Sequence, residues 1–412
     1  MNFQTTISDR TVLKYYLYMA TKWAHLAGPI WVLFLLSRGI SYTQIGLLDS
    51  FFAFAVLFGE VPTGFLGDRI GRRNSLLIGI VLLSLSSFMF AFTYSFYGFV
   101  VLYIFWSLGQ SFQSGTDSAW LFDILKEQEG LDQEDYTRIR GRGNALGLLV
   151  SGAAAIAGGY LGEINLAIPW IISGTIVGLG FFIVLTFPDS AQFSEDSDEK
   201  PFTIMDVLPV IRERFINSPL GPFVVYVGLF FGVLGAVEYF IQPISVDMGI
   251  SVTQIGWIYG GFTVVSASVS YFSEEIKRTI GIRRWFNIIP PVLGVLFIAI
   301  LVFPAVAIPL FFLMKGARNG SSPLETQYIN DNTVSKGRAT AISIVFMVHS
   351  LFEIPLAVGA GALADFTSPL TAIILLGILL ATGSITIQLW QDPVSEPDND
   401  IVMEESQSTS ND

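Results

Sequence analysis

The stretch GISYTQIG, residues 39–46, recurs as GISVTQIG at residues 249–256, with seven identities in eight positions. The offset between the two copies is 210 residues, about half of the 412-residue chain. A polar phrase with no evident chemistry of its own is therefore repeated once in each half. The same offset superposes two further pairs, Gly71 on Gly281 and Arg73 on Arg283. Together these matches favour duplication of one unit over a chance echo.

The composition excludes an ordinary soluble protein. Hydrophobic residues make up 52% of the chain and charged residues 14%, whereas soluble domains carry about a quarter charged residues. The chain has no cysteine, which rules out disulfides, thiolate metal sites and cysteine nucleophiles. The net charge of -12 gathers in two acidic stretches, Asp189–Glu199 and Asp392–Asp412. We expect both to be solvated and disordered, with an acidic binding tail as the alternative.

Long apolar segments predict an all-α membrane protein with twelve transmembrane helices. A helix needs roughly 20 mainly apolar residues to cross the ~30 Å hydrocarbon layer. No secretory signal peptide is expected, because residues 1–9 are polar. The twelve predicted spans are residues 13–37, 44–66, 75–94, 96–122, 144–162, 166–187, 221–246, 254–273, 285–303, 305–329, 339–363 and 369–390.

Basic residues predict the orientation. With a cytoplasmic N-terminus, 18 of the 22 Lys and Arg residues fall on the cytoplasmic side. On the opposite side only Arg38 lies in a loop, and the other three basic residues lie within spans. Such a bias fixes the orientation even where acids share the loops. We therefore expect a multi-pass protein of the cytoplasmic membrane with both termini in the cytoplasm.

The predicted organisation has two halves. Residues 1–187 form an N-terminal six-helix bundle, 188–220 a cytoplasmic linker, 221–390 a C-terminal six-helix bundle and 391–412 an acidic tail. Two parallel six-helix repeats related by an axis along the membrane normal are typical of secondary transporters. In each half the repeated phrase precedes the second span. Its glycine is expected to end one helix, and Ser41 or Ser251 to cap the next.

The loop GFLGDRIGRRNSL, residues 64–76, resembles the signature loop of the major facilitator superfamily (MFS), and the preceding EVPTG, residues 60–64, resembles a variant found in one branch of that family. The resemblance implies the twelve-helix MFS fold and a cytoplasmic interlock of Asp68 and Arg72 with Asp123. On charge alone the loop is equally a basic loop and nothing more. The expected gate residues are Gly64, Asp68, Arg69, Gly71, Arg72, Arg73 and Asp123.

Three departures from the family pattern limit what it implies. Arg278 stands where a second-half counterpart of Asp68 would be, so the lock is predicted to be one-sided. The fourth span carries no arginine between residues 96 and 125. Ala154 and Ala155 replace the Gly-Pro pair of the antiporter motif, although Gly158 and Gly159 are present. Export by proton exchange therefore has no motif of its own here.

Several ionisable residues fall inside predicted spans, where a charge costs roughly 2.5–3.5 kcal/mol on insertion scales and usually faces a cavity or a partner. The alternatives are snorkelling for the lysines and arginine, and simple packing for His25. The candidate cavity residues are Lys22, His25, Glu60, Asp117, Glu238, Lys315, Arg318, His349 and Glu353.

Glu60 and Glu353 each precede a proline by two residues, which places each carboxylate at an expected helix bend. We interpret either one as a proton carrier that pairs alternately with Lys22 or Arg318, against the alternative of a fixed buried ion pair. His349 and Glu353 have helical spacing for a metal pair, but two ligands without a third make a metal site weak. No metal and no cofactor is expected.

The sequence favours a secondary active transporter that moves a small organic solute by alternating access, coupled to protons. Export of an amphipathic compound is preferred because the spans are rich in aromatic residues. The first alternative is uptake of an anionic solute on the basic residues of the spans. A membrane sensor or intramembrane enzyme is the second, although no enzyme motif is present. The expected partners are a small-molecule substrate and the lipid bilayer, with no nucleic acid, and the protein is expected to be a monomer.

Overall fold

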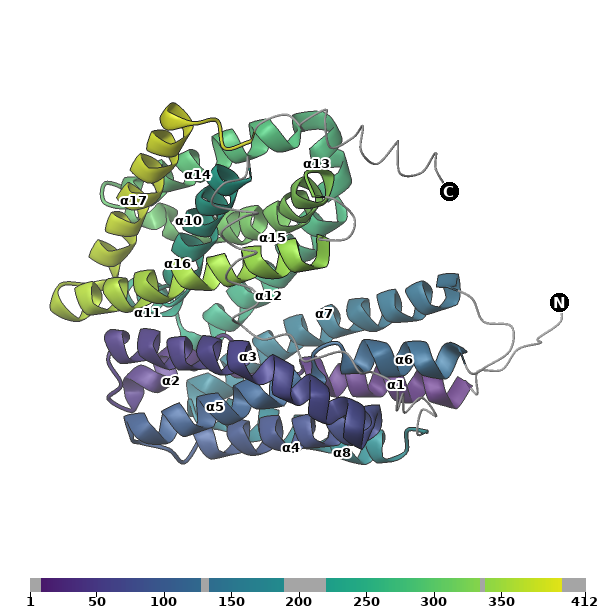
Figure 1. Cartoon of the computed structure of the whole chain (residues 1–412). Coiled ribbons are helices and arrows are strands. Elements are labelled where there is room, and N and C mark those ends of the chain that lie inside the picture. Colours follow the sequence, from purple (N-terminus) through teal and green to yellow (C-terminus); the bar gives the residue numbers. More distant parts are fainter. Residues whose placement is uncertain (1–8, 127–132, 189–219, 334–337, 395–412) are drawn as a thin grey trace, which may run out of the picture. The chain divides into compact units, whose positions relative to one another are not determined.

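The computed structural model describes residues 9–126, 133–188, 220–333 and 338–394, and the regular elements of these residues are all helices (Figure 1). The first half contains α1 (Asp9–Trp23), α2 (Trp31–Ser37), α3 (Tyr42–Ile70), α4 (Arg72–Phe90), α5 (Phe96–Gln113), α6 (Thr116–Lys126), α7 (Gln133–Ile164) and α8 (Ile168–Leu185). The second contains α10 (Gly221–Glu238), α11 (Ile241–Asp247), α12 (Val252–Tyr271), α13 (Ser273–Ile280), α14 (Ile282–Ala299), the 3-10 turn η2 (Pro304–Val306), α15 (Ala307–Asp331), α16 (Arg338–Phe366) and α17 (Pro369–Trp390).

The chain divides into two compact units. Unit 1 holds Met1–Ile40, Leu48–Phe202 and Ile250–Thr263, and unit 2 holds Ser41–Leu47, Thr203–Gly249 and Val264–Asp412. The units follow the two halves except at two short segments, which carry the repeated phrases and pack with the opposite half of the sequence. The predicted linker between Pro188 and Leu220, and the acidic tail from residue 395 onward, lie outside the described residues.

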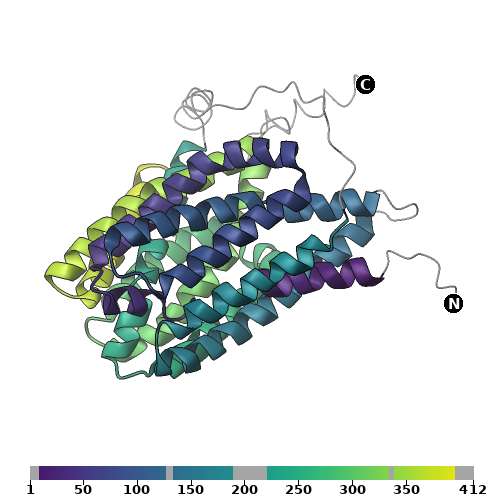
Figure 2. The same ribbon diagram turned by 90° about the horizontal axis from the view of Figure 1, so that it is seen from below.

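The helices pack in the same order in both units. In unit 1, α1 lies beside α7 and α8, and α4 beside α8 (Figures 1 and 2). In unit 2, α10 lies beside α16 and α17, and α14 beside α17. In each unit these four helices correspond to the first, third, fifth and sixth predicted spans of that half. This agreement supports the duplication that the sequence offset predicts.

Eight described helices are long and apolar enough to cross a membrane by length and composition alone. The first, fourth, eighth and tenth predicted spans do not meet that criterion. Two of these are also interrupted, contrary to the prediction of unbroken helices: the first between α1 and α2, and the fourth between α5 and α6. The seventh is long enough but ends early, because α10 stops at Glu238 and α11 begins at Ile241.

The repeated phrase forms the helix start that was predicted for it. Gly39 and Gly249 have φ angles of 78° and 80°, a region that glycine adopts without a Cβ clash. The Ser41 hydroxyl accepts a hydrogen bond from the Gln44 amide at 3.3 Å, and the Gln44 side chain accepts one from the Ser41 amide at 3.0 Å. This reciprocal capping box is repeated at Ser251, with distances of 3.2 and 2.9 Å.

In unit 2, the start of α3 packs on α16 through small residues and a carboxylate. A Cβ atom on Gly46 would lie 2.9 Å from the Ala357 backbone, so only glycine allows this approach. Asp365 then accepts hydrogen bonds of 2.9 Å from the backbone amides of both Tyr42 and Thr43. A carboxylate at this position satisfies amides that have no partner within their own helix.

Unit 1 contains the matching arrangement between α12 and α7. A Cβ atom on Gly256 would lie 2.8 Å from the Ala155 carbonyl oxygen and 2.8 Å from the Gly159 Cα. Glu163 accepts a hydrogen bond of 2.9 Å from the Thr253 amide. The two docking segments, residues 155–163 and 357–365, share the pattern Ala-x3-Gly-x3-acid at an offset of 202 residues. The repeated phrases therefore each meet a repeated docking segment, a contact that the sequence analysis did not foresee.

We expect Gly361→Ala to destabilise the protein and Gly359→Ala to leave it intact or stabilise it slightly. A Cβ atom on Gly361 would lie 2.5 Å from the Tyr42 carbonyl oxygen, whereas Gly359 has nothing within 4 Å. Overpacking against backbone costs roughly 1–3 kcal/mol, while alanine in an open helical position gains roughly 0.5–1 kcal/mol over glycine. Thermal unfolding of the purified variants in detergent measures both effects. Equal unfolding midpoints would contradict the docking contact.

Candidate functional site

The first helix of unit 1 is interrupted where two candidate residues lie. α1 ends at Trp23, and the chain makes a series of turns before α2 begins at Trp31. Within these turns the Leu26 amide donates a hydrogen bond of 2.9 Å to the Ser173 hydroxyl on α8. Interrupted helices at corresponding places in the two halves of a transporter mark its binding region. The breaks after Trp23 and after Glu238 fit this description.

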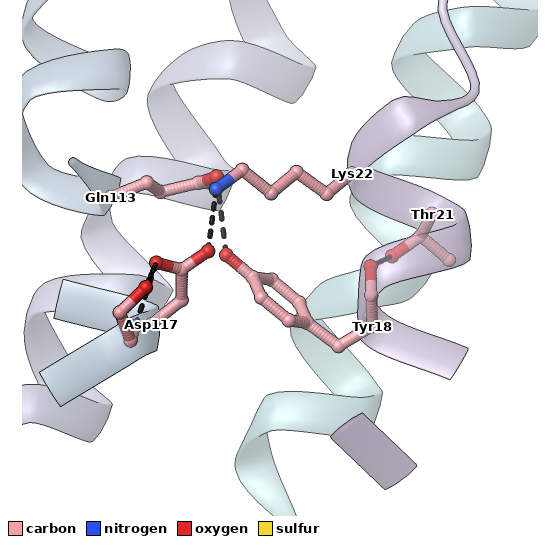
Figure 3. Close-up of polar contacts among 6 residues, drawn as sticks. Tyr18, Thr21, Lys22, Gln113 and Asp117 are labelled. Carbon is pink, nitrogen blue, oxygen red and sulfur yellow. Dashed lines mark hydrogen bonds and ion pairs between the residues drawn. The ribbon is translucent and has the colours of Figure 1, made fainter. Parts of the chain in front are cut away.

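Lys22 is held by Asp117 at the second break in unit 1 (Figure 3). The distance from Lys22 Nζ to Asp117 Oδ2 is 2.6 Å. α5 ends at Gln113, and Asp117 lies in the first turn of α6, just after Gly115 with its φ of 70°. The Tyr18 hydroxyl donates a hydrogen bond of 3.2 Å to the side-chain oxygen of Gln113. The ion pair of Lys22 with Asp117 and the hydrogen bond of Tyr18 with Gln113 therefore join α1 to the α5–α6 segment. Both contacts lie close to the helix breaks.

A second charge cluster lies in unit 2. One carboxylate oxygen of Glu238, the last residue of α10, lies 2.8 Å from Lys315 Nζ and 2.8 Å from Arg318 Nη1. Glu353 lies close enough to interact electrostatically with Arg318. A Cβ atom on Gly235 would lie 2.3 Å from the Glu353 carboxyl group, so this glycine makes room for it. The cluster thus brings together four residues named from the sequence, two cations and two carboxylates.

The observed ion pairs differ from the expected partners. Lys22 contacts Asp117 and not Glu60, which is exposed on α3. Arg318 forms an ion pair with Glu238 and interacts electrostatically with Glu353 as well. Sequence spacing placed each group in a span but could not give the rotation of its helix. The role of Glu60 as a proton carrier stays a prediction.

His349 is paired with a residue that the sequence analysis did not name. Its Nε2 lies 2.8 Å from Glu325 Oε1, and the two side chains are 10% and 2% exposed. The imidazole stacks on Phe231 with ring centroids 4.4 Å apart. Glu325 lies seven residues after Arg318 on α15, close to the same helix face, and this spacing could have identified it. Among the described residues no three potential ligands cluster as a metal site, so the His349 and Glu353 spacing has no third ligand there.

A cavity of about 250 Å³ lies in unit 1 next to the break that holds His25. Its aromatic lining comes from several helices and includes Trp31, Phe52, Tyr103, Trp106 and Trp170. Asp49 on α3 also lines it and was not named from the sequence, although it is the one other acidic residue in the predicted span of Glu60. A neighbouring cavity contains Lys22 and shares His25 and Gln110 with the first. The aromatic cavity therefore adjoins the ion pair.

The predicted gate loop lies between α3 and α4. Arg72 Nε is 3.7 Å from Asp123 Oδ2, which brings together two of the three residues expected in the interlock. The side chain of Asp68 lies outside the described part of the structure. Gly71, with a φ of 89°, makes the turn into α4. Arg69 lies over the Phe65 ring, 4.4 Å from its centroid.

The remaining gate positions are Gly64 and Arg73, and the second half has a corresponding loop. A Cβ atom added at Gly64 would have nothing within 4 Å, and Arg73 is the second residue of α4. In the second half Gly281 repeats the turn with a φ of 81°. Arg278 there pairs with Glu275 of its own helix at 2.8 Å. Arg278, which stands at the position that corresponds to Asp68, is thus paired within its own helix.

Comparison with known proteins decides the family. The Major Facilitator Superfamily profile matches residues 16–354. The chain belongs to the Major Facilitator Superfamily. Among curated relatives, YxaM of Bacillus subtilis (strain 168), named an uncharacterized MFS-type transporter, is 27% identical over 266 residues, 61% of this chain and 63% of YxaM. YwoD, of the same strain and also named an uncharacterized MFS-type transporter, is 27% identical over 143 residues, 35% of this chain and 32% of YwoD. The matches thus span less than two thirds of either relative.

Solved structures confirm the fold. The nucleoside transporter NupG superposes with a TM-score of 0.73 and 13% identity, covering 93% of this chain and 99% of NupG. A D-xylose-proton symporter superposes with a TM-score of 0.65 and 12% identity, covering 95% of this chain and all of the symporter. At these identities the likeness shows the twelve-helix MFS fold alone. The family places the chain among multi-pass membrane transport proteins.

Proposed function

We propose that this transporter exports a small amphipathic organic compound in exchange for protons, by alternating access of a central site. The observation that carries the proposal is the aromatic cavity of unit 1. Aromatic side chains supply large apolar contact surfaces with few polar groups, which suits an amphipathic solute. The cavity also adjoins the break between α1 and α2, where such transporters bind their substrates.

The arrangement of cations disfavours the alternative of anion uptake. Lys22 contacts Asp117 in unit 1, and Lys315 and Arg318 share Glu238 in unit 2. A carboxylate partner offsets the charge that would attract an anionic solute. The basic residues therefore support a structural or coupling role better than an anion site.

The buried pair of His349 and Glu325 is suited to carry the coupling proton. An imidazole and a carboxylate in contact can accept a proton and pass it on. In this proposal the transporter needs no cofactor and is driven by the proton gradient. In this proposal it is also a monomer in the cytoplasmic membrane. Both of its termini lie in the cytoplasm, an orientation that the bias of basic residues supports.

The test is reconstitution in liposomes with an imposed pH gradient and a pH dye inside. Addition of an amphipathic solute should move protons against the solute flux. We expect Glu325→Gln, which keeps the shape of the side chain, to lower gradient-driven transport at least tenfold while solute exchange without a gradient persists. Asp331→Asn is the control, because Asp331 is exposed on the same helix. Gradient-driven transport by Glu325→Gln at the wild-type rate would exclude the pair as the proton carrier.

A further inference from the structure

The lining of the aromatic cavity in unit 1 contains one acidic residue, Asp49. Of its twelve lining residues, Asp49 is the one carboxylate, and none is a lysine or an arginine. Asp49 is half-buried and lies in the part of α3 that belongs to unit 1. A carboxylate in a mainly apolar lining attracts a cation and repels an anion more strongly than it would in water.

The lining of this cavity contains no lysine or arginine. Lys22 lines the neighbouring cavity and contacts Asp117 at 2.6 Å. Arg38 donates a hydrogen bond of 2.7 Å to the Ala91 carbonyl oxygen, and its guanidinium lies 3.9 Å from the centroid of the Tyr94 ring. Neither belongs to the lining of the aromatic cavity. An anionic ligand would therefore find a carboxylate and no cation there.

The aromatic rings of the cavity are fixed in orientation by their neighbours. Trp106 and Trp170 stand nearly perpendicular, with centroids 5.7 Å apart and an interplanar angle of 82°. Trp170 stacks on Phe90 behind it at 4.4 Å, and Trp106 stacks on His25 at 6.0 Å. Aromatic faces carry partial negative charge and attract cations, Trp most strongly. Two braced indoles beside one carboxylate form a site for a positively charged group.

We infer that this cavity binds a small organic monocation, an ammonium or a quaternised nitrogen attached to an apolar ring, with Asp49 as its counter-charge and Trp106 and Trp170 as its aromatic walls. The cavity volume of about 250 Å³ lies below the ~300–1,000 Å³ of drug-sized pockets, which suits a single ring system. This inference rests on the proposed function, since it names the class of compound that the transporter would export.

The test compares three probes of nearly equal shape: benzyltrimethylammonium, the neutral neopentylbenzene and the anionic phenylmethanesulfonate. Radiolabelled benzyltrimethylammonium binds to the purified full chain in detergent, and the other two compete. We expect neopentylbenzene to compete at least tenfold more weakly than unlabelled cation, and phenylmethanesulfonate not to compete at a hundredfold excess. This test needs only the wild-type protein. Equal competition by the neutral probe, or better competition by the anion, would overturn the inference.

Variants then assign the charge. Asp49→Asn should weaken binding of the cation at least tenfold, whereas Asp49→Glu, which keeps the charge, should recover most of it. Asp331→Asn, an exposed site far along the sequence, should bind as the wild type does. Unchanged cation binding by Asp49→Asn would overturn the role of this carboxylate.

Failure of the two proposals can be told apart, because binding in detergent needs no gradient. Cation binding without gradient-driven movement in liposomes would overturn export and leave the cavity assignment standing. Movement of amphipathic solutes without cation binding would overturn the cavity assignment and leave export standing.

Discussion

Replacing Gly158 by alanine is expected to disrupt the protein more than any other single methyl group added at the described glycines. A Cβ atom there would lie 1.9 Å from the Leu26 carbonyl oxygen and 2.8 Å from the Leu26 carbonyl carbon. Contacts below about 3 Å to backbone cannot be relieved by a side-chain rotation. Leu26 lies in the break between α1 and α2, so α7 or the break itself must move. We expect a loss of about 3 kcal/mol or more, at the upper end of overpacking costs.

The measurement is the thermal unfolding midpoint in detergent together with the yield of monodisperse protein. Gly152→Ala on the same helix is the control, because its nearest neighbour would be Thr263 at 3.8 Å, an ordinary contact. That variant should unfold at or slightly above the wild-type temperature, since alanine favours a helix by roughly 0.5–1 kcal/mol over glycine. A Gly158→Ala protein as stable as Gly152→Ala would show that α7 does not lie against the break.

The duplicated architecture could be predicted because its signal is local. A glycine that needs a positive φ, followed by a serine and a glutamine that cap the next helix, leaves a short polar phrase in each half. The direct match at an offset of 210 residues then fixes the halves. The docking segments at residues 155–163 and 357–365 could not be predicted so easily, because Ala-x3-Gly-x3-acid is a common pattern in apolar helices. Only their partners make them recognisable.

The helix breaks and the ion pairs could not be predicted from hydropathy. The segment across residues 24–30 contains one ionisable residue, His25, so a sliding window of hydropathy does not detect the turns there. The partner of Lys22 depends on which face of α6 carries Asp117 and on the depth of both helices. These are tertiary properties. The sequence therefore identified both Lys22 and Asp117 as candidate cavity residues, but the carboxylates expected to pair with Lys22 or Arg318 were Glu60 and Glu353.

Glu325 and Asp49 were missed for different physical reasons. Glu325 lies near the end of the tenth predicted span, where a carboxylate can reach the membrane surface at little cost. The structure shows instead that its side chain is buried and contacts His349. Asp49 lies near the start of the second span, where an interfacial position is the simpler interpretation. Its place in the lining of a cavity follows from the approach of α2, α5 and α8, which no local pattern encodes.

Glu238→Gln should be the most damaging change among the charged residues of unit 2. The carboxylate is the shared partner of Lys315 and Arg318, each 2.8 Å from the same oxygen. Its removal leaves two cations a few ångströms apart in a partly buried site with Glu353 as the nearest other carboxylate. Breaking a buried ion pair by removal of one partner costs about 3–5 kcal/mol. Because Glu238 is 32% exposed, we expect the lower end of that range, about 3 kcal/mol.

The double variant Glu238→Gln with Lys315→Met separates charge from packing. It leaves one cation facing Glu353, so most of the lost stability should return if uncompensated charge is the cause. Glu275→Gln is the matched control, since Glu275 pairs with Arg278 at the same 2.8 Å but both side chains are exposed. An exposed pair of this kind contributes about 0–1 kcal/mol, so its loss should barely move the unfolding midpoint. If the double variant is no more stable than Glu238→Gln alone, the cluster holds α10 against α15 through shape and hydrogen bonding and not through its balance of charge.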